Sequence, residues 1–157
     1  MRLAHRNRAT VSSPRTAPGT VARPVVLATI EATLTSEAAA VAVDAAVESG
    51  QPLLVVNAVE ASLAPCSFVL GYDTIVPPDV EESLRAPAEL AHSLGVAVER
   101  LRLRSPRPVD ALLELVAERS PGLLVVGPDP ARIRPRTLRK ATKRIRAEAD
   151  CLVWLPS

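Results

Sequence analysis

Short apolar runs alternate with longer amphipathic segments along most of this chain. Runs of about four to eight apolar residues, rich in valine and leucine, are typical of strands buried on both faces of a parallel sheet. Segments that keep charged residues on one helical face and end near glycine or proline predict helices. The expected strands cover 25–30, 52–59, 96–104, 123–126 and 151–155, and the expected helices cover 36–49, 79–93, 108–120 and 137–147.

Five strands that alternate with four helices predict an α/β fold with a doubly wound, five-stranded parallel sheet. We expect a Rossmann-like arrangement of three layers, with the sheet between two layers of helices and the strands in the order 3-2-1-4-5. In such sheets, ligands bind beyond the carboxyl ends of the strands, where the strand order reverses. The expected crevice therefore lies between the first and fourth strands, flanked by 29–36 and 127–142.

The domain predicted from this pattern spans 24–157, and a basic arm precedes it. Residues 1–23 are rich in Arg, Ser, Thr and Pro and have no apolar period, which predicts a disordered segment. The third strand alternates leucine and arginine at 101–104, so one of its faces is expected to meet solvent. Its arginines suit an exposed sheet edge. Asp79 is expected to cap the helix that follows the long connection.

Composition favours a single domain, because 48% of the 157 residues are hydrophobic, which is enough for a sizeable core. No apolar run approaches the ~20 residues that span a bilayer, and no apolar block follows the N-terminal arginines. We therefore expect a cytoplasmic protein with no membrane contact. Cys66 and Cys151 are too isolated for a disulfide framework or a metal site, so we expect reduced thiols buried as small apolar side chains.

The net charge of +2 conceals a strong asymmetry. Residues 1–23 carry five Arg and no acid, residues 24–130 carry six Arg against fifteen Asp and Glu, and residues 131–157 carry eight Lys and Arg against two acids. An acidic body with a basic C-terminal segment can steer an anionic ligand toward that segment. A solvated basic helix face explains the same pattern, and charge alone leaves both interpretations open.

Five segments carry a family resemblance through their order and spacing. Glu31-Ala32-Thr33 follows the first strand, Val56-Asn57-Ala58-Val59-Glu60 ends the second, and Arg107-Pro108-Val109-Asp110-Ala111-Leu112 opens the third helix. Leu124-Val125-Val126-Gly127 forms the fourth strand, and Ala149-Asp150-Cys151-Leu152-Val153 leads into the fifth. Together they resemble the universal stress protein family over 24–156. The resemblance implies the three-layer fold expected above and a role in stress response.

The resemblance also implies where a nucleotide would bind. Nucleotide-binding members of the family carry Gly-x-x-Gly and, after a spacer, Gly-Ser or Gly-Thr. Here Gly127 matches the first glycine, Pro130 stands at the second, and Arg139-Lys140 stands near the closing pair. Glycine lets the backbone approach a phosphate closely, whereas proline has no N–H to donate. These departures predict weak or absent ATP binding, and Glu31 replaces the aspartate that the family places near the ribose.

An alternative is that side chains capture an anion at this loop. Cations near a helix N-terminus are disfavoured by the helix dipole unless a counter-charge is present, and arginine forks bind phosphate in two places. The other interpretation is an empty site whose arginines point into water. The candidate ligand-binding residues on this hypothesis are Thr29, Glu31, Ala58, Val126, Gly127, Arg132, Arg136, Arg139, Lys140 and Thr142.

Other chemistries lack their residues. His5 and His92 have no further ligand at metal-binding spacing, and the serines lack a Gly-x-Ser-x-Gly elbow, so we expect no metal, no catalytic residues and no enzymatic activity. Nucleic-acid binding is disfavoured because only Phe68, Tyr72 and Trp154 are aromatic.

Dimerisation has a better basis in the sequence. The fifth strand, Cys151-Leu152-Val153-Trp154-Leu155, is apolar throughout and lies at the expected sheet edge, which favours a homodimer. The sequence therefore predicts a non-catalytic, universal stress protein-like regulatory module without a cofactor. The alternatives are a protein that binds ATP or another phosphate ligand and a basic adaptor for nucleic acid or protein.

Overall fold

A computed structural model describes residues 5–10, 21–61 and 76–157, with 5–10 described by their backbone. The strands are β1 (His5–Thr10), β2 (Val25–Ile30), β3 (Leu53–Glu60), β4 (Val98–Ser105), β5 (Leu123–Val126) and β6 (Leu152–Trp154). The helices are α1 (Ser36–Ser49), α3 (Pro78–Ser93), α4 (Pro108–Arg119) and α5 (Pro135–Glu148).

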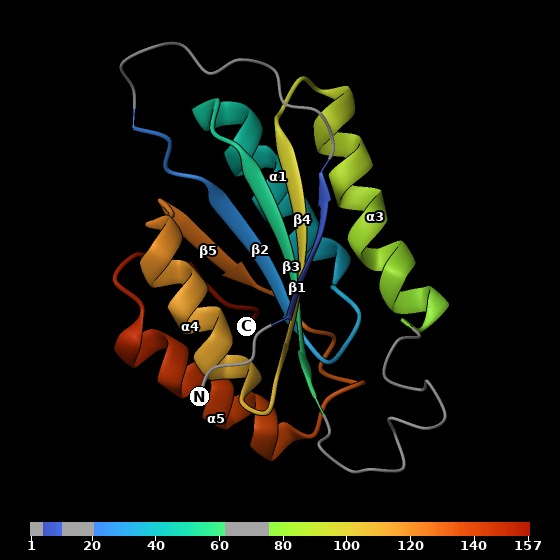
Figure 1. Cartoon of the computed structure of the whole chain (residues 1–157), viewed down its shortest axis with the longest axis vertical. Helices are drawn as coiled ribbons and strands as arrows, with labels where there is room; N and C mark the ends of the chain where they lie inside the picture. The colour runs from blue at the N-terminus through green and yellow to red at the C-terminus, as the bar shows by residue number, and fades with distance from the viewer. Residues whose placement is uncertain (1–4, 11–20, 62–75) are drawn as a thin grey trace.

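The strands form one sheet in the order β1-β4-β3-β2-β5-β6, shown in Figure 1. In this order, the neighbouring strands β4, β3, β2, β5 and β6 all run parallel to one another. Counted along the predicted domain, they have the order 3-2-1-4-5, so the predicted fold class and strand order are confirmed. The reversal of order places the C-terminal ends of β2 and β5 side by side.

Strand β1 corrects the expectation of disorder at residues 5–10 of the arm. It pairs antiparallel with β4, with His5 opposite Arg104 and Thr10 opposite Glu99. The edge of β4 is therefore covered by β1 rather than exposed. An uncovered strand offers a row of backbone donors and acceptors, which a segment without any apolar period can satisfy through its own backbone. Sequence periodicity does not register this kind of pairing.

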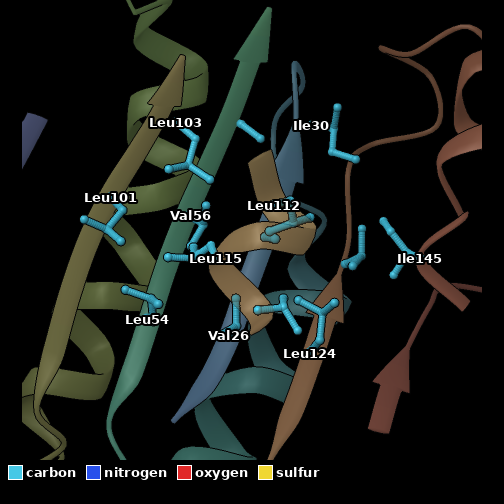
Figure 2. Packing of buried hydrophobic residues seen from close by; sticks show 14 of the residues in the cluster. Val26, Ile30, Leu54, Val56, Leu101, Leu103, Leu112, Leu115, Leu124 and Ile145 are labelled. Atoms are coloured by element: carbon cyan, nitrogen blue, oxygen red, sulfur yellow. The ribbon is translucent and has the colours of Figure 1, made fainter. Parts of the chain in front are cut away.

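Of the helices in the described residues, α4 and α5 lie on one face of the sheet and α1 and α3 on the other (Figure 1). Figure 2 shows Leu112 and Leu115 of α4 pointing toward the sheet, where Val56 and Leu124 project from β3 and β5. Ile145 of α5 extends the same core, and it is fully buried. Truncating one such side chain to alanine costs ~2–5 kcal/mol, so this layer is strongly specified.

Helix α1 begins and ends where its sequence predicts. The hydroxyl of Thr35 accepts from the backbone N–H of Ala38 at 3.2 Å, and Gly50 ends the helix at a φ of 65°. That backbone conformation favours glycine. Helix α3 differs from expectation, because Pro77 is its N-cap and makes no side-chain capping bond. Asp79 therefore lies inside the first turn, where its carboxylate is available for an ion pair described below.

The cysteines and the last strand complete the fold. Cys66 lies outside the described residues, and Cys151 is a free, partly buried thiol whose pKa is raised by its burial and by the charge of Asp150. Strand β6 lies at the sheet edge as predicted, and Leu152 there is 74% exposed. Among the described helices, none is long and apolar enough to cross a membrane.

Candidate functional site

The crevice at the ends of β2 and β5 is bridged by backbone hydrogen bonds. The N–H of Thr35 donates to the carbonyl of Gly127 at 2.9 Å, and the N–H of Asp129 donates to the carbonyl of Thr33 at 2.8 Å. The N–H of Gly127 donates to the carbonyl of Ala28 at 3.0 Å. The turn after β2 and the loop after β5 therefore hold each other in place.

The loop after β5 also satisfies its remaining donors internally. The N–H of Ala131 donates to a carboxylate oxygen of Asp129 at 3.0 Å, and the N–H of Arg132 donates to the carbonyl of the same residue, also at 3.0 Å. Pro128 and Pro130 have no N–H to offer. From 127 to 132, every backbone N–H is thus already hydrogen-bonded within the chain.

Gly127 owes its identity to packing in this structure. A Cβ at this position would lie 2.0 Å from the Cβ of Ala38 and 3.3 Å from the hydroxyl of Thr35. Its backbone φ is not positive, unlike those of Gly50 and Gly95. The glycine that matches the family motif therefore permits close contact between the loop and α1. On that side, α1 occupies the space beside the glycine.

Glu31 and Thr29, the two candidate polar residues at the end of β2, are both engaged. Glu31 has a φ of 54°, a conformation that costs a non-glycine residue ~1–2 kcal/mol. Its N–H donates to the carbonyl of Ala58 at 3.0 Å, and its carboxylate accepts from the N–H of Glu60 at 2.8 Å, which fixes it on β3. Thr29 is fully buried and donates its hydroxyl proton to the carbonyl of Ala32 at 2.6 Å.

Helix α3 contacts both the turn after β2 and the loop after β5. The N–H of Leu34 donates to the hydroxyl of Ser83 at 3.1 Å. The guanidinium of Arg132 forms an ion pair with Asp79 in the first turn of α3. Arg132, a predicted anion ligand, is thereby paired with a carboxylate of its own chain.

The basic residues of α5 face outward. Arg136, Arg139 and Lys140 are exposed, while Ala141 and Ile145 form the buried side of the helix. Within the described part of the chain, these three cations form no ion pair. Thr142 lies partly buried on α5, where its hydroxyl donates to the carbonyl of Arg139 at 3.2 Å.

The structure thus divides the candidate residues into three groups. One group meets at the ends of β2, β3 and β5, one residue is paired to α3, and the rest lie along α5. In that order they are Thr29, Glu31, Ala58, Val126 and Gly127; Arg132; and Arg136, Arg139, Lys140 and Thr142.

Comparison with known proteins identifies the fold to which this crevice belongs. No protein-family model matches the sequence, and no curated protein matches it. Among solved structures, a universal stress protein in complex with cAMP matches with a TM-score of 0.62 and 23% identity, over 88% of this chain and 99% of that protein. The chain has the universal stress protein fold.

Two further universal stress proteins support the assignment of the fold. UspA from Lactobacillus plantarum matches with a TM-score of 0.63 and 13% identity, over 88% of this chain and 100% of that protein. The protein from Archaeoglobus fulgidus in complex with dAMP matches with a TM-score of 0.57 and 15% identity, over 87% of this chain and 98% of that protein.

Within this universal stress protein fold, one polar cluster contains a single predicted candidate, Thr29, together with two residues that the sequence does not single out as site residues. Thr29, Asn57 and Arg102 are aligned across β2, β3 and β4 on the face covered by α1 and α3. A cavity opens beside the last two, lined also by Glu81 and Arg100. The available signals were an asparagine inside an apolar strand and the alternating arginines of β4. The alternation predicts that these arginines face solvent, whereas the side chain of Arg100 is only 26% exposed.

Proposed function

We propose that the protein is a non-catalytic regulatory module of the universal stress protein type whose crevice does not hold ATP. The loop at 127–132 carries this proposal, because all of its backbone N–H groups are already hydrogen-bonded within the chain. A phosphate at such a loop is held mainly by backbone N–H groups. With those donors engaged and prolines at two positions, the loop lacks the groups that would hold a triphosphate.

The side chains of the crevice support the non-catalytic part of the proposal. Hydrolysis of a nucleotide requires a group that can take a proton from water or stabilise the charge that develops. The hydroxyl of Thr29 is buried and donates to a backbone carbonyl, and the carboxylate of Glu31 accepts from the N–H of Glu60. Both groups serve the fold of the turn after β2.

Calorimetric titration with ATP and Mg²⁺ tests the proposal directly. We expect no binding in the micromolar range, and micromolar binding by the wild type would contradict it. A variant that restores the motif, with Pro130→Gly, Arg139→Gly and Lys140→Ser, separates two causes. Gain of ATP binding assigns the loss to the motif residues, and no gain assigns it to the internally paired loop. Lys143→Gly with Arg146→Ser, in the same helix, controls for glycine in α5.

A second candidate function is binding of an anionic ligand by α5. The exposure of Arg136, Arg139 and Lys140, without ion pairs in the described chain, favours it. Two solved neighbours are complexes with cAMP and dAMP. Phosphate should then raise the melting temperature, because a ligand of the native state stabilises it. Arg136→Gln with Arg139→Gln should abolish that rise, whereas Lys143→Gln with Arg146→Gln should keep it.

The same basic surface would serve a third candidate, an adaptor for nucleic acid or an acidic protein. Binding of that kind weakens steeply with salt, because each contact releases counterions. A gel-shift titration over increasing salt distinguishes it from a discrete anion site, which the paired variants above would identify. A dimer through β6 belongs to the proposed module and is tested separately below.

A further inference from the structure

A cavity of about 180 Å³ lies between α3 and the β3–β4 pair, one strand away from the crevice described above. A water molecule needs ~10–15 Å³ by the same kind of measure, so the space is large enough for a small organic molecule. Pockets that hold drug-sized ligands span ~300–1,000 Å³, so a whole nucleotide does not fit. Its apolar walls come from Val55, Val76 and Leu84.

Two of the residues that line this cavity each carry a buried polar atom without a hydrogen-bond partner in the described chain. These atoms are the side-chain oxygen of Asn57, a residue only 3% exposed, and the Nε of Arg102. The two residues are direct neighbours across β3 and β4. A buried polar group without a partner destabilises the native state, so such a pair is unusual in a core. One atom needs a donor and the other needs an acceptor.

The charges around the cavity are unbalanced. Glu81 and Arg100 form an ion pair at 2.5 Å, so their charges compensate each other. Arg102 forms no ion pair within the described residues, and burial together with the charge of Arg104 lowers its pKa. Arginine nevertheless stays protonated at any physiological pH. One positive charge is therefore left over in a partly buried place, and a monoanion would neutralise it.

We propose that this cavity binds a small organic carboxylate that also carries one hydrogen-bond donor. The carboxylate accepts from Nε and a terminal N–H of Arg102, the side-on geometry that a guanidinium fork favours. The donor of the ligand meets the oxygen of Asn57, and a short carbon chain lies against Val55 and Leu84. Dianions are disfavoured because Glu81 lies in the lining.

Lactate and propionate form a matched pair of probes, since they differ by the hydroxyl donor. Added as sodium salts to the full chain at about pH 7, with sodium chloride as the ionic-strength control, lactate should raise the melting temperature to a saturable limit. Its midpoint concentration should be about tenfold lower than that of propionate, because only lactate satisfies the buried oxygen of Asn57.

Two substitutions locate the site. Arg102→Met should abolish the lactate shift, and Asn57→Leu should remove the difference between lactate and propionate. Arg146→Met, on the exposed face of α5 and outside the candidate ligand-binding residues, should leave both effects intact. If Arg102→Met fails to fold, Arg102→Lys serves instead, and it should weaken lactate binding at least about tenfold because lysine lacks the fork. The side-chain amide NMR signals of Asn57 should move with lactate in the wild type.

Three outcomes would overturn the proposal. They are a lactate shift no larger than that of chloride, a full lactate shift in Arg102→Met or Arg102→Lys, and tighter saturable binding of inorganic phosphate than of lactate that Arg102→Met abolishes and Arg136→Gln with Arg139→Gln keeps. The last would assign the cavity to a phosphate group. The test does not depend on the crevice, so ATP binding there would leave its result unaffected.

Discussion

Replacement of Gly127 by alanine tests the packing of the crevice most sharply. The added Cβ would lie 2.0 Å from the Cβ of Ala38. Carbon atoms in contact are normally ~3.5–4.0 Å apart, so the loop and α1 must separate by about 1.5 Å. Neither wall can yield by rotating a side chain, since the clash involves a Cβ on each backbone. Overpacking of this kind costs ~1–3 kcal/mol, and we expect about 3 kcal/mol here.

The assay is chemical denaturation of the variant beside Gly122→Ala, its matched control. A Cβ at Gly122 would lie 3.6 Å from the Cβ of Arg23, which is ordinary contact, and its φ is not positive. That control should be unchanged or more stable by up to ~1 kcal/mol. A loss of about 3 kcal/mol in Gly127→Ala corresponds to a fall of roughly 6–12 °C in melting temperature for a chain of this size.

A double-mutant cycle identifies the clash as the cause. Ala38→Gly alone should cost ~1 kcal/mol, the usual penalty for glycine in a helix. Combined with Gly127→Ala, it removes the closest contact, so the double variant should be more stable than the sum of the two losses by about 2 kcal/mol. Equal stability of Gly127→Ala and Gly122→Ala, or strictly additive losses, would refute the packing explanation of this glycine.

Two further predictions concern β6 and its neighbour Cys151. Sedimentation of the wild type should give a dimer mass, and a wild-type monomer at high micromolar concentration rejects the idea. Leu152→Lys should weaken the dimer without unfolding the protein, since Leu152 is 74% exposed. Leu94→Lys, at the C-cap of α3 and 55% exposed, should leave the dimer intact. In a Cys66→Ser background, alkylation of Cys151 at about pH 8 should be slower in the folded than in the urea-unfolded protein. The reason is that burial raises the pKa of the Cys151 thiol and so lowers its thiolate fraction. Equal alkylation rates in the two states would contradict this prediction.

The sequence predicts the parallel part of the fold well, because hydrophobic burial determines it. Strand β5 and helix α1 have the predicted bounds, and both are set by local signals: a fully apolar run, and a Thr35 cap with a Gly50 stop. Helix α5 begins two residues before its predicted start, at Pro135. A proline in the first turn lacks only an N–H that would have no helical partner, so it does not delay the helix.

Strand β1 shows what periodicity cannot reveal. Backbone hydrogen bonds along the edge of β4 set its register, and no apolar pattern in His5–Thr10 predicts this pairing. The same limit applies to the turn after β2. Glu31 adopts a positive φ, and its hydrogen bonds to Ala58 and Glu60, two residues on a different strand, hold it there.

The candidate site shows a further limit of sequence analysis, because the function of a polar residue depends on which residue it pairs with in the folded chain. Arg132 and Arg100 belong to the same class of cation in the sequence, yet one pairs with Asp79 and the other with Glu81, both in the first turns of α3. Within the described residues, Arg102 has no such partner, and the acids of α3 pair with other arginines. The ligand-binding capacity that we propose for this chain therefore arises from the charges left uncompensated after folding, and only the three-dimensional pairing identifies them.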